Sequence, residues 1–205
     1  MSARDLFATV ALMLGAYLLG SVPFSFLVAR ARGVDLRAVG SGNLGGANVW
    51  RSCGFGPFLV AVTCDLLKGF LPARAGLWLG LPPPSVVLIG VCAILGHTFS
   101  LFMRFRGGKA VATSGGVLLA IAPLLMLFGI AVWVIVLLAA RISSVASLAA
   151  AGAVVAVATA LLLLGRLSPA YAALVWGGAA LIVYLHRANI QRLRNGTENR
   201  FQKLL

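Results

Sequence analysis

The chain has 205 residues, of which 61% are hydrophobic and only 10% are charged, and its mean hydropathy is +1.03. This composition excludes an ordinary soluble domain. Seventeen Lys and Arg stand against four Asp and Glu, so the net charge is +13. In a soluble protein such a surplus would suggest a nucleic-acid partner. In a membrane protein it first encodes orientation, so we expect no nucleic acid here.

Apolar stretches, each near the ~20 residues that a helix needs to cross a bilayer, predict an all-α polytopic membrane protein. The first helix is expected over residues 6–29 and is retained, because no A-x-A-like cleavage site follows it. The apolar stretch 110–140 is longer than one span needs and contains Pro123, so we divide it there. The remaining helices are then expected over residues 55–71, 85–103, 110–122, 124–140, 145–164 and 169–185.

About seven transmembrane helices would place the two termini on opposite sides of the membrane. Thirteen of the seventeen basic residues fall in the loops 30–51, 104–109 and 141–144 or in the tail from residue 186. The positive-inside rule therefore predicts an outside N-terminus, a cytoplasmic C-terminus and glycine-rich loops on the cytoplasmic face. Five helices, with residues 110–140 re-entrant, remain an alternative. Since no repeat of fixed period is present, we expect one domain over residues 1–205.

The first loop contains a G-x-G-x-x-G pattern from Gly40 to Gly45, but a dinucleotide site requires a strand before this pattern, and a membrane helix precedes it here. Glycines still allow backbone N–H groups to surround an anion, and Ser41, Asn43 and Arg51 would add side-chain donors. The alternatives are a flexible loop in which glycine only permits turns, or a helix-packing face with G-x-x-x-G spacing.

The second loop places Gly107, Gly108 and Lys109 directly before a helix expected to start near Ala110. Backbone donors, the positive end of the helix dipole and an ammonium group would then surround one point, which suits phosphate. The Walker pattern is absent, because Ala110 stands where Ser or Thr is required. His97 ends the preceding helix and is either a donor, acceptor or base for this point, or a structural residue.

The third loop offers Ser143 and Ser144 at the start of a helix, where Ser144 is either an N-cap or a ligand-binding residue. Asp65 and Lys68 are three residues apart on one helix face, so they either neutralise each other or form part of a functional site within the membrane. The sequence shows no protease triad, zinc-binding motif or glycosidase carboxylate pair, so we expect neither a metal nor an organic cofactor.

Four blocks of this sequence together resemble the bacterial acyl-phosphate:glycerol-3-phosphate acyltransferases, and the resemblance covers almost the whole chain. The blocks are residues 20–51 with the DLLKG stretch 65–69, residues 96–113, residues 141–147, and the tail from His186 to Glu198. The chain departs from the family pattern at Gly46, Ala47, Ser100 and Ala110. The change at Ala110 reduces the conformational freedom of the loop where phosphate is expected to bind.

The resemblance implies transfer of a fatty acyl group from long-chain acyl phosphate to the 1-hydroxyl of sn-glycerol 3-phosphate, giving lysophosphatidic acid and phosphate, the first step of phospholipid synthesis. It also implies a place among the lipids of the bacterial cytoplasmic (inner) membrane, with the active site facing the cytoplasm. A transporter of an organic phosphate or other anion is the alternative. Neither chain-length preference nor oligomeric state follows from the sequence.

The substrates that the resemblance implies suggest a role for each loop. Lys109, His97, Ser41 and Arg51 are expected to be catalytic, and either His97 or an oxygen of the acyl phosphate takes the hydroxyl proton. Acyl phosphate is expected at the second and third loops, and glycerol 3-phosphate at the first. The expected substrate-binding residues are Asn43, Gly107, Gly108, Ser143, Ser144, His186, Asn189 and Glu198.

Overall fold

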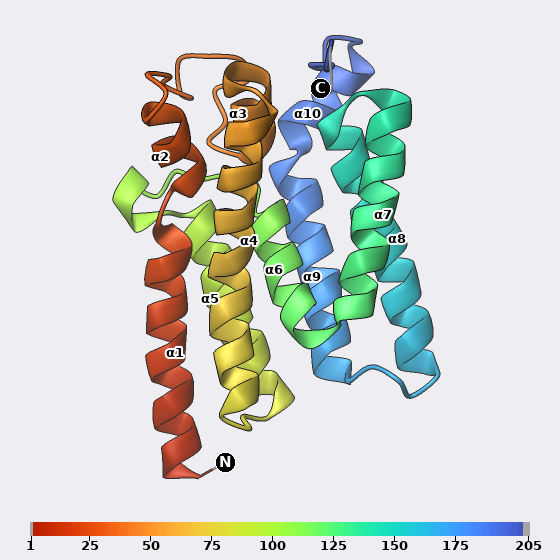
Figure 1. The fold of residues 1–205 in the computed structure, drawn as a ribbon. Coiled ribbons are helices and arrows are strands. Elements are labelled where there is room, and N and C mark those ends of the chain that lie inside the picture. The colour runs from red at the N-terminus through yellow and green to blue at the C-terminus, as the bar shows by residue number, and fades with distance from the viewer. Residues whose placement is uncertain (1, 203–205) are drawn as a thin grey trace. The chain divides into compact units, whose positions relative to one another are not determined.

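The computed structural model describes residues 2–202, and all regular secondary structure in that range is helical (Figure 1). The all-helical architecture expected from the apolar stretches is therefore confirmed. By its contacts the chain divides after Ile121 into two compact units. The first unit contains α1 Ala3–Ser21, α2 Phe24–Arg30, α3 Gly46–Cys53, α4 Phe55–Trp78, α5 Pro83–Thr98, the short 3₁₀ helix η1 Leu101–Met103, and α6 Val111–Ile121. The second contains α7 Pro123–Ala140, α8 Ser143–Leu163, α9 Pro169–Leu185 and α10 Arg187–Arg194.

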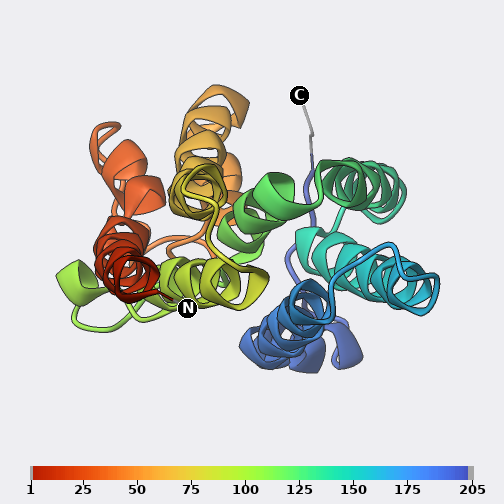
Figure 2. The same ribbon diagram turned by 90° about the horizontal axis from the view of Figure 1, so that it is seen from below.

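Long helices form the frame of the first unit, where α1 packs against α5 and α4 contacts α1, α5 and α6 (Figure 2). Ser2 caps α1, because its hydroxyl accepts a hydrogen bond from the backbone N–H of Asp5 while the Asp5 carboxylate accepts one from the Ser2 backbone. In the second unit, α7 packs on α8 and α8 on α9. Indole groups reinforce these two pairs: Trp133 donates to Ser147 and Trp176 donates to Thr159, each at 3.1 Å.

The helix expected over residues 6–29 is broken into α1 and α2, which corrects the prediction of one continuous helix, although Ala3–Arg30 together remain one candidate span. Val22 is extended, with φ −62° and ψ 119°, and Pro23 separates α1 from α2. Proline supplies no backbone N–H and disfavours helical conformation in the residue before it, so the carbonyls of the preceding turn lose their intrahelical partners. Beside the break, the Val22 carbonyl accepts a hydrogen bond of 3.0 Å from the Phe24 N–H. The carbonyls of Ser21 and Val22 also accept hydrogen bonds from side chains of the site described below.

Two further helices lie where only loop or tail was expected. The first loop ends in α3, which places Trp50 on the ring of Phe58 with 4.5 Å between ring centroids. The polar tail forms α10. The helix-packing face suggested for the first loop is not present at Gly42, because this residue lies outside the helices with a φ of +67°.

Five helical segments of the described chain are long and apolar enough to cross a membrane, two of them with a break: Ala3–Arg30, Phe55–Trp78, Pro83–Met103, Pro123–Ala140 and Ser143–Leu163. The pair α9–α10, bent by 54°, adds a sixth if it is counted as one span. The seventh apolar segment, α6, has only 11 residues. At 1.5 Å per residue it extends about 16 Å, roughly half the hydrocarbon thickness. The described helices thus support five or six spans.

The crossing of α4 and α6 depends on two glycines. A Cβ added at Gly69 would overlap the carbonyl oxygen of Thr113, and one added at Gly116 would overlap that of Leu66. Such direct contact of backbones through small residues is typical of helix pairs in membranes. It brings the short helix α6, and the loop that precedes it, against the middle of α4.

Replacing Gly116 by alanine should therefore destabilise the first unit by about 1–3 kcal/mol, the usual cost of overpacking. Neither overlapping atom belongs to a flexible side chain, so α6 would have to move. Thermal unfolding in detergent, followed by circular dichroism, measures the effect. Gly15→Ala on α1 is the matched control, because a Cβ there has no neighbour within 4 Å. Equal melting temperatures for the two variants would contradict this account of the crossing.

Candidate functional site

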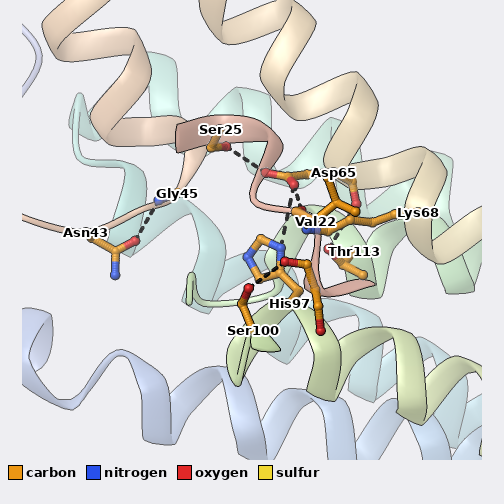
Figure 3. A network of polar contacts seen from close by, with 10 residues as sticks. Val22, Ser25, Asn43, Gly45, Asp65, Lys68, His97, Ser100 and Thr113 are labelled. Atoms are coloured by element: carbon orange, nitrogen blue, oxygen red, sulfur yellow. Dashed lines mark hydrogen bonds and ion pairs between the residues drawn. The ribbon is translucent and has the colours of Figure 1, made fainter. Parts of the chain in front are cut away.

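A cleft opens beside the break between α1 and α2, and Figure 3 shows the polar network that forms its wall. The empty space between its walls, with the open solvent at its mouth included, is about 220 Å³. All of its lining residues belong to the first unit, and they are Ser21, Pro23, Ser25, Leu44, Asp65, Lys68, His97, Ser100, Gly107 and Gly108. Three predicted site residues, His97, Gly107 and Gly108, are therefore brought together.

The carbonyls of Ser21 and Val22, beside the break at Pro23, accept side-chain hydrogen bonds from two other segments of the unit. The Ser100 hydroxyl donates to the Ser21 carbonyl at 2.5 Å, and the Lys68 ammonium donates to the Val22 carbonyl at 2.9 Å. Buried carbonyls without partners are costly, so these bonds stabilise the bend. Ser100, one of the departures from the family pattern, has a clear structural task here.

Asp65 lies at the centre of the network and is only 2% exposed. Its Oδ1 lies 2.9 Å from the Lys68 ammonium, and its Oδ2 accepts a hydrogen bond of 2.6 Å from the Ser25 hydroxyl. The expected pairing of Asp65 with Lys68 is confirmed. The carboxylate has a further neighbour, however, because Nδ1 of His97 is 3.6 Å from Oδ1.

Gly107 and Gly108 allow the backbone to approach His97 closely, and neither residue has a positive φ. A Cβ at Gly107 would overlap the carbonyl oxygen of His97, and one at Gly108 would overlap Nε2 of its ring. The Gly108 N–H also donates to the His97 carbonyl at 3.2 Å. This turn, Gly107–Gly108, is thus folded directly against His97.

The helix after this turn begins one residue later than expected, at Val111. Ala110 is left-handed with φ +55°, as are Arg104 and Phe105 before the turn. Left-handed conformation costs a residue with a Cβ roughly 1–2 kcal/mol. The backbone therefore adopts at Ala110 a conformation that glycine would favour, and the alanine side chain strains the loop there. Lys109, half-buried, lies between Gly108 and this residue.

The first loop is organised by Asn48, which is 1% exposed and was not singled out in the sequence. Its amide nitrogen donates to the carbonyls of Leu36, Val39 and Asn43, and its oxygen accepts from the Ser41 N–H. One amide thus holds the loop at four points. The sequence indicates this role only weakly, by an asparagine two residues after Gly46, where its side chain can bond to nearby backbone groups.

Of the residues expected to bind from this loop, two also hold the loop itself. The Asn43 oxygen accepts from the Gly45 N–H at 2.9 Å, and the Ser41 hydroxyl accepts from the Asn43 N–H at 3.4 Å. Arg51 lies in the last turn of α3. Leu44 is the loop residue that lines the cleft, while Ser41, Asn43, Arg51 and Lys109 are not among the lining residues.

Asp35 and Arg37, earlier in the same loop, form a forked ion pair with N–O distances of 2.6 and 2.9 Å. Hydrogen bonds from Arg37 lower the pKa of Asp35 to about 2. The Arg37 guanidinium also lies 5.3 Å from the centroid of the Phe26 ring. The pair therefore fixes the loop to α2.

A second polar cluster lies within the second unit and is centred on Glu198. The Glu198 carboxylate accepts hydrogen bonds from Ser144 at 2.9 Å, from Asn189 at 2.5 Å and from Arg192 at 2.7 Å. The suggestion that Ser144 caps α8 is wrong, because Ile142 occupies the N-cap position and Ser144 donates to Glu198 instead. The tail thereby joins the start of α8 to α10.

Two other predicted residues, Ser143 and His186, are buried in this unit. Nδ1 of His186 lies 2.8 Å from the carbonyl oxygen of Ile182. Because a carbonyl only accepts, Nδ1 must carry the proton in this contact. The predicted residues thus fall into two groups: those of the cleft and first loop in one unit, and Ser143, Ser144, His186, Asn189 and Glu198 in the other.

Burial alone would raise the pKa of Glu198, but the hydrogen bonds from Asn189, Arg192 and Ser144 outweigh it and lower the pKa. A depressed folded-state pKa stabilises the protein above the unfolded pKa, near 4.5, and this contribution is lost as the pH falls. Glu198→Gln should therefore unfold more easily than wild type at pH 7, by about 1–3 kcal/mol. The difference should shrink below pH ~4.5, which denaturation curves at both pH values would measure. A difference independent of pH would contradict the charged cluster.

Comparisons with known proteins find similarity over almost the full length of this chain. A model of the glycerol-3-phosphate acyltransferase family matches residues 10–196. A glycerol-3-phosphate acyltransferase of Roseiflexus sp. (strain RS-1) is 60% identical over 197 residues, which cover 96% of this chain and 97% of the relative. One from Thermus thermophilus is 45% identical over 194 residues, which cover 94% of this chain and 95% of that relative.

Two crystal structures of PlsY, described as an integral membrane glycerol 3-phosphate acyltransferase, share the fold. The glycerol 3-phosphate form matches with a TM-score of 0.87 at 38% identity. The lysophosphatidic acid form matches with a TM-score of 0.85 at 37% identity. Each match covers 96% of both chains.

Proposed function

The chain belongs to the glycerol-3-phosphate acyltransferase family, and we propose that it takes its acyl group from a long-chain acyl phosphate held at the turn of Gly107 and Gly108. It is an acyltransferase that acylates the 1-hydroxyl of sn-glycerol 3-phosphate and gives lysophosphatidic acid, the first step of phospholipid synthesis. With the proposed donor, the other product is phosphate.

The observation that carries the choice of donor site is the close approach of Gly108 to Nε2 of His97, in a turn that leads into α6. The first turn of a helix has N–H groups without intrahelical acceptors and carries the positive end of the helix dipole, and both favour a phosphate at the start of α6. Lys109 adds an ammonium there. These groups would hold the donor and stabilise the charge that develops on the leaving phosphate.

Glycerol 3-phosphate would bind at the first loop, through Ser41, Asn43 and Arg51. The Arg51 fork suits two phosphate oxygens, and α3 provides a rigid support for it. The loop that carries Ser41 and Asn43 is held in shape by Asn48. Its Leu44 lines the cleft, which supports an approach of the acceptor from this side.

The five residues of the second unit, Ser143, Ser144, His186, Asn189 and Glu198, also belong to the proposed substrate-binding set. Their hydroxyl, amide and imidazole groups suit phosphate and hydroxyl oxygens. Glu198 would act by fixing Ser144 and Asn189, since it accepts a hydrogen bond from each.

In the reaction, the glycerol 1-oxygen attacks the acyl carbonyl carbon and forms the ester bond. The bond between that carbon and the bridging phosphate oxygen breaks, and phosphate leaves with its electron pair. The hydroxyl proton passes either to Nε2 of His97 or to an oxygen of the leaving phosphate. Because phosphate is already a good leaving group, orientation and electrostatics supply most of the rate without an acyl-enzyme.

We further propose a single domain over residues 1–205, because the family match extends through both compact units. Seven crossings are obtained when the bent pair α9–α10 and the short helix α6 are both counted with the five long spans. With the N-terminus outside, the C-terminus cytoplasmic and the active site facing the cytoplasm of the bacterial inner membrane, they would account for thirteen basic residues in the loops and tail. Labelling of single cysteines introduced at Arg74 and Arg194 with a membrane-impermeant reagent, in a variant lacking the three native cysteines, tests this orientation. Only the cysteine at position 74 should react in intact cells.

The donor is tested with purified protein in detergent, labelled glycerol 3-phosphate and either palmitoyl phosphate or palmitoyl-CoA. We expect lysophosphatidate from the phosphate donor and, with Lys109→Ala, a loss of at least about 100-fold in turnover. Equal use of the CoA donor would overturn the proposed donor. Uptake of glycerol 3-phosphate into proteoliposomes without acylation would indicate a transporter. A His97→Ala variant with wild-type turnover would exclude His97 as the base.

A further inference from the structure

His97 is held between two different surroundings on the two nitrogens of its ring. Nε2 meets the turn of Gly107 and Gly108, where an alanine Cβ would overlap it, and the ring lines the cleft. Nδ1 is buried, has no hydrogen-bond partner of ordinary length in the part of the chain that the structure describes, and lies 3.6 Å from Asp65 Oδ1 (Figure 3). One nitrogen thus faces the substrate side and the other faces a buried carboxylate.

Asp65 itself is fixed from several directions. Ser25 on α2 donates to Oδ2, and Lys68 on the next turn of α4 pairs with Oδ1. Its backbone is held as well, because the Thr113 hydroxyl on α6 donates to the Asp65 carbonyl at 2.9 Å. A carboxylate restrained in this way has a fixed position, so it can orient the imidazole beside it.

The simpler interpretation is that Asp65 only neutralises Lys68. That interpretation accounts for the ion pair but not for the position of the histidine ring, which turns its buried Nδ1 toward the same oxygen. A buried N–H needs an acceptor, and a carboxylate is the strongest acceptor available in proteins. Hydrogen bonds at active sites without substrate are often long and shorten when substrate binds, which suits a separation of 3.6 Å.

We propose that Asp65 is a positioning residue for His97. Its carboxylate accepts the Nδ1–H bond, which fixes both the ring orientation and the tautomer, so that Nε2 carries no proton and accepts a hydrogen bond in the cleft. Ser25 and Lys68 act one step further out by fixing the carboxylate. The catalytic consequence rests on the proposed function, whereas the tautomer does not.

The tautomer can be observed directly, because the chain contains only two histidines. Labelling the histidines with ¹⁵N and recording nitrogen shifts of the full chain in lipid nanodiscs gives two sets of signals, which a His97→Gln variant assigns. We expect the wild-type protein at neutral pH to have His97 protonated on Nδ1 and unprotonated on Nε2. A proton on Nε2 would overturn the proposal, even if the enzyme is an active acyltransferase. No variant of Asp65 is needed for this measurement.

The kinetic test uses the double variant Asp65→Leu with Lys68→Met, which removes the carboxylate without leaving a buried ammonium unpaired. Its turnover should fall by about 100-fold, the lower end of what proton-transfer groups contribute, while the KM for glycerol 3-phosphate changes little. The His97 signals should show a mixture of tautomers. Ser25→Ala, which keeps the carboxylate and its histidine contact, is the matched control and should lose less than about 10-fold.

A merely structural Asp65 would act independently of His97. The decisive comparison therefore adds the double variant to a His97→Gln background. If Asp65 acts through the histidine, the combined protein should be no slower than His97→Gln alone, because both changes remove the same contribution. Multiplication of the two losses would overturn the positioning role. Lack of acylation in the wild type itself would instead refute the proposed function and leave the tautomer measurement standing.

Discussion

Gly108→Ala should reduce turnover by at least about 100-fold while the protein stays folded, because displacement of a reacting group by about 1 Å is enough for such a loss. The added Cβ would overlap Nε2 of His97 and lie 3.1 Å from Cε1. The ring is the movable partner, so it must turn away from the site that the turn forms. The backbone around it has no clash to relieve, since all three of the nearest atoms belong to that ring.

Two other glycines frame this prediction. Gly107→Ala meets backbone oxygens of His97 and Thr98 instead of a ring, so it should lower both turnover and melting temperature. Gly56→Ala, at the start of α4, has no neighbour within 4 Å and should alter neither. Initial-rate kinetics and thermal unfolding in detergent compare the three variants. Wild-type turnover in Gly108→Ala would mean that His97 does not need its present position.

The apolar stretches predicted the helices well, because length and hydropathy are properties of one segment at a time. The break at Pro23 was missed although the proline is visible in the sequence, since the residues on both sides of it are apolar. The side chains that stabilise the break come from distant segments: Ser100 donates a hydrogen bond to the Ser21 carbonyl, and Lys68 donates one to the Val22 carbonyl. No local pattern near Pro23 indicates these partners.

In the candidate site, too, local features can be predicted from the sequence and contacts between distant segments cannot. The pairing of Asp65 with Lys68 follows from helical spacing, but Ser25 and His97 reach the same carboxylate from α2 and α5. The sequence predicts that Gly107 and Gly108 supply backbone donors to a phosphate, but it does not show that the His97 backbone and ring leave no room for a Cβ at either position. Tertiary contacts of this kind cannot be derived from spacing alone.

Lys68→Met should be the most destabilising of the substitutions considered for the cleft. Lys68 is 2% exposed, pairs with Asp65 at 2.9 Å and donates to the Val22 carbonyl. Methionine fills a similar volume but leaves a buried carboxylate without its counter-charge. Breaking one side of a buried ion pair typically costs about 3–5 kcal/mol. Thermal unfolding in detergent, or the yield of folded protein where the loss is too large for a melting curve, measures the effect.

The double variant Asp65→Leu with Lys68→Met distinguishes two quantities: the cost of leaving one buried charge unpaired, and the contribution of the intact ion pair to stability. With both charges removed, an apolar pair of similar volume is often as stable as the ion pair it replaces, so most of the lost stability should return. The recovery should be incomplete, because the Val22 carbonyl at the helix break still lacks the hydrogen bond that Lys68 supplied. A double variant as unstable as Lys68→Met would show that the Val22 contact, and not the buried charge, dominates. A folded double variant with low turnover would instead mean that the ion pair is retained for His97 and not for stability.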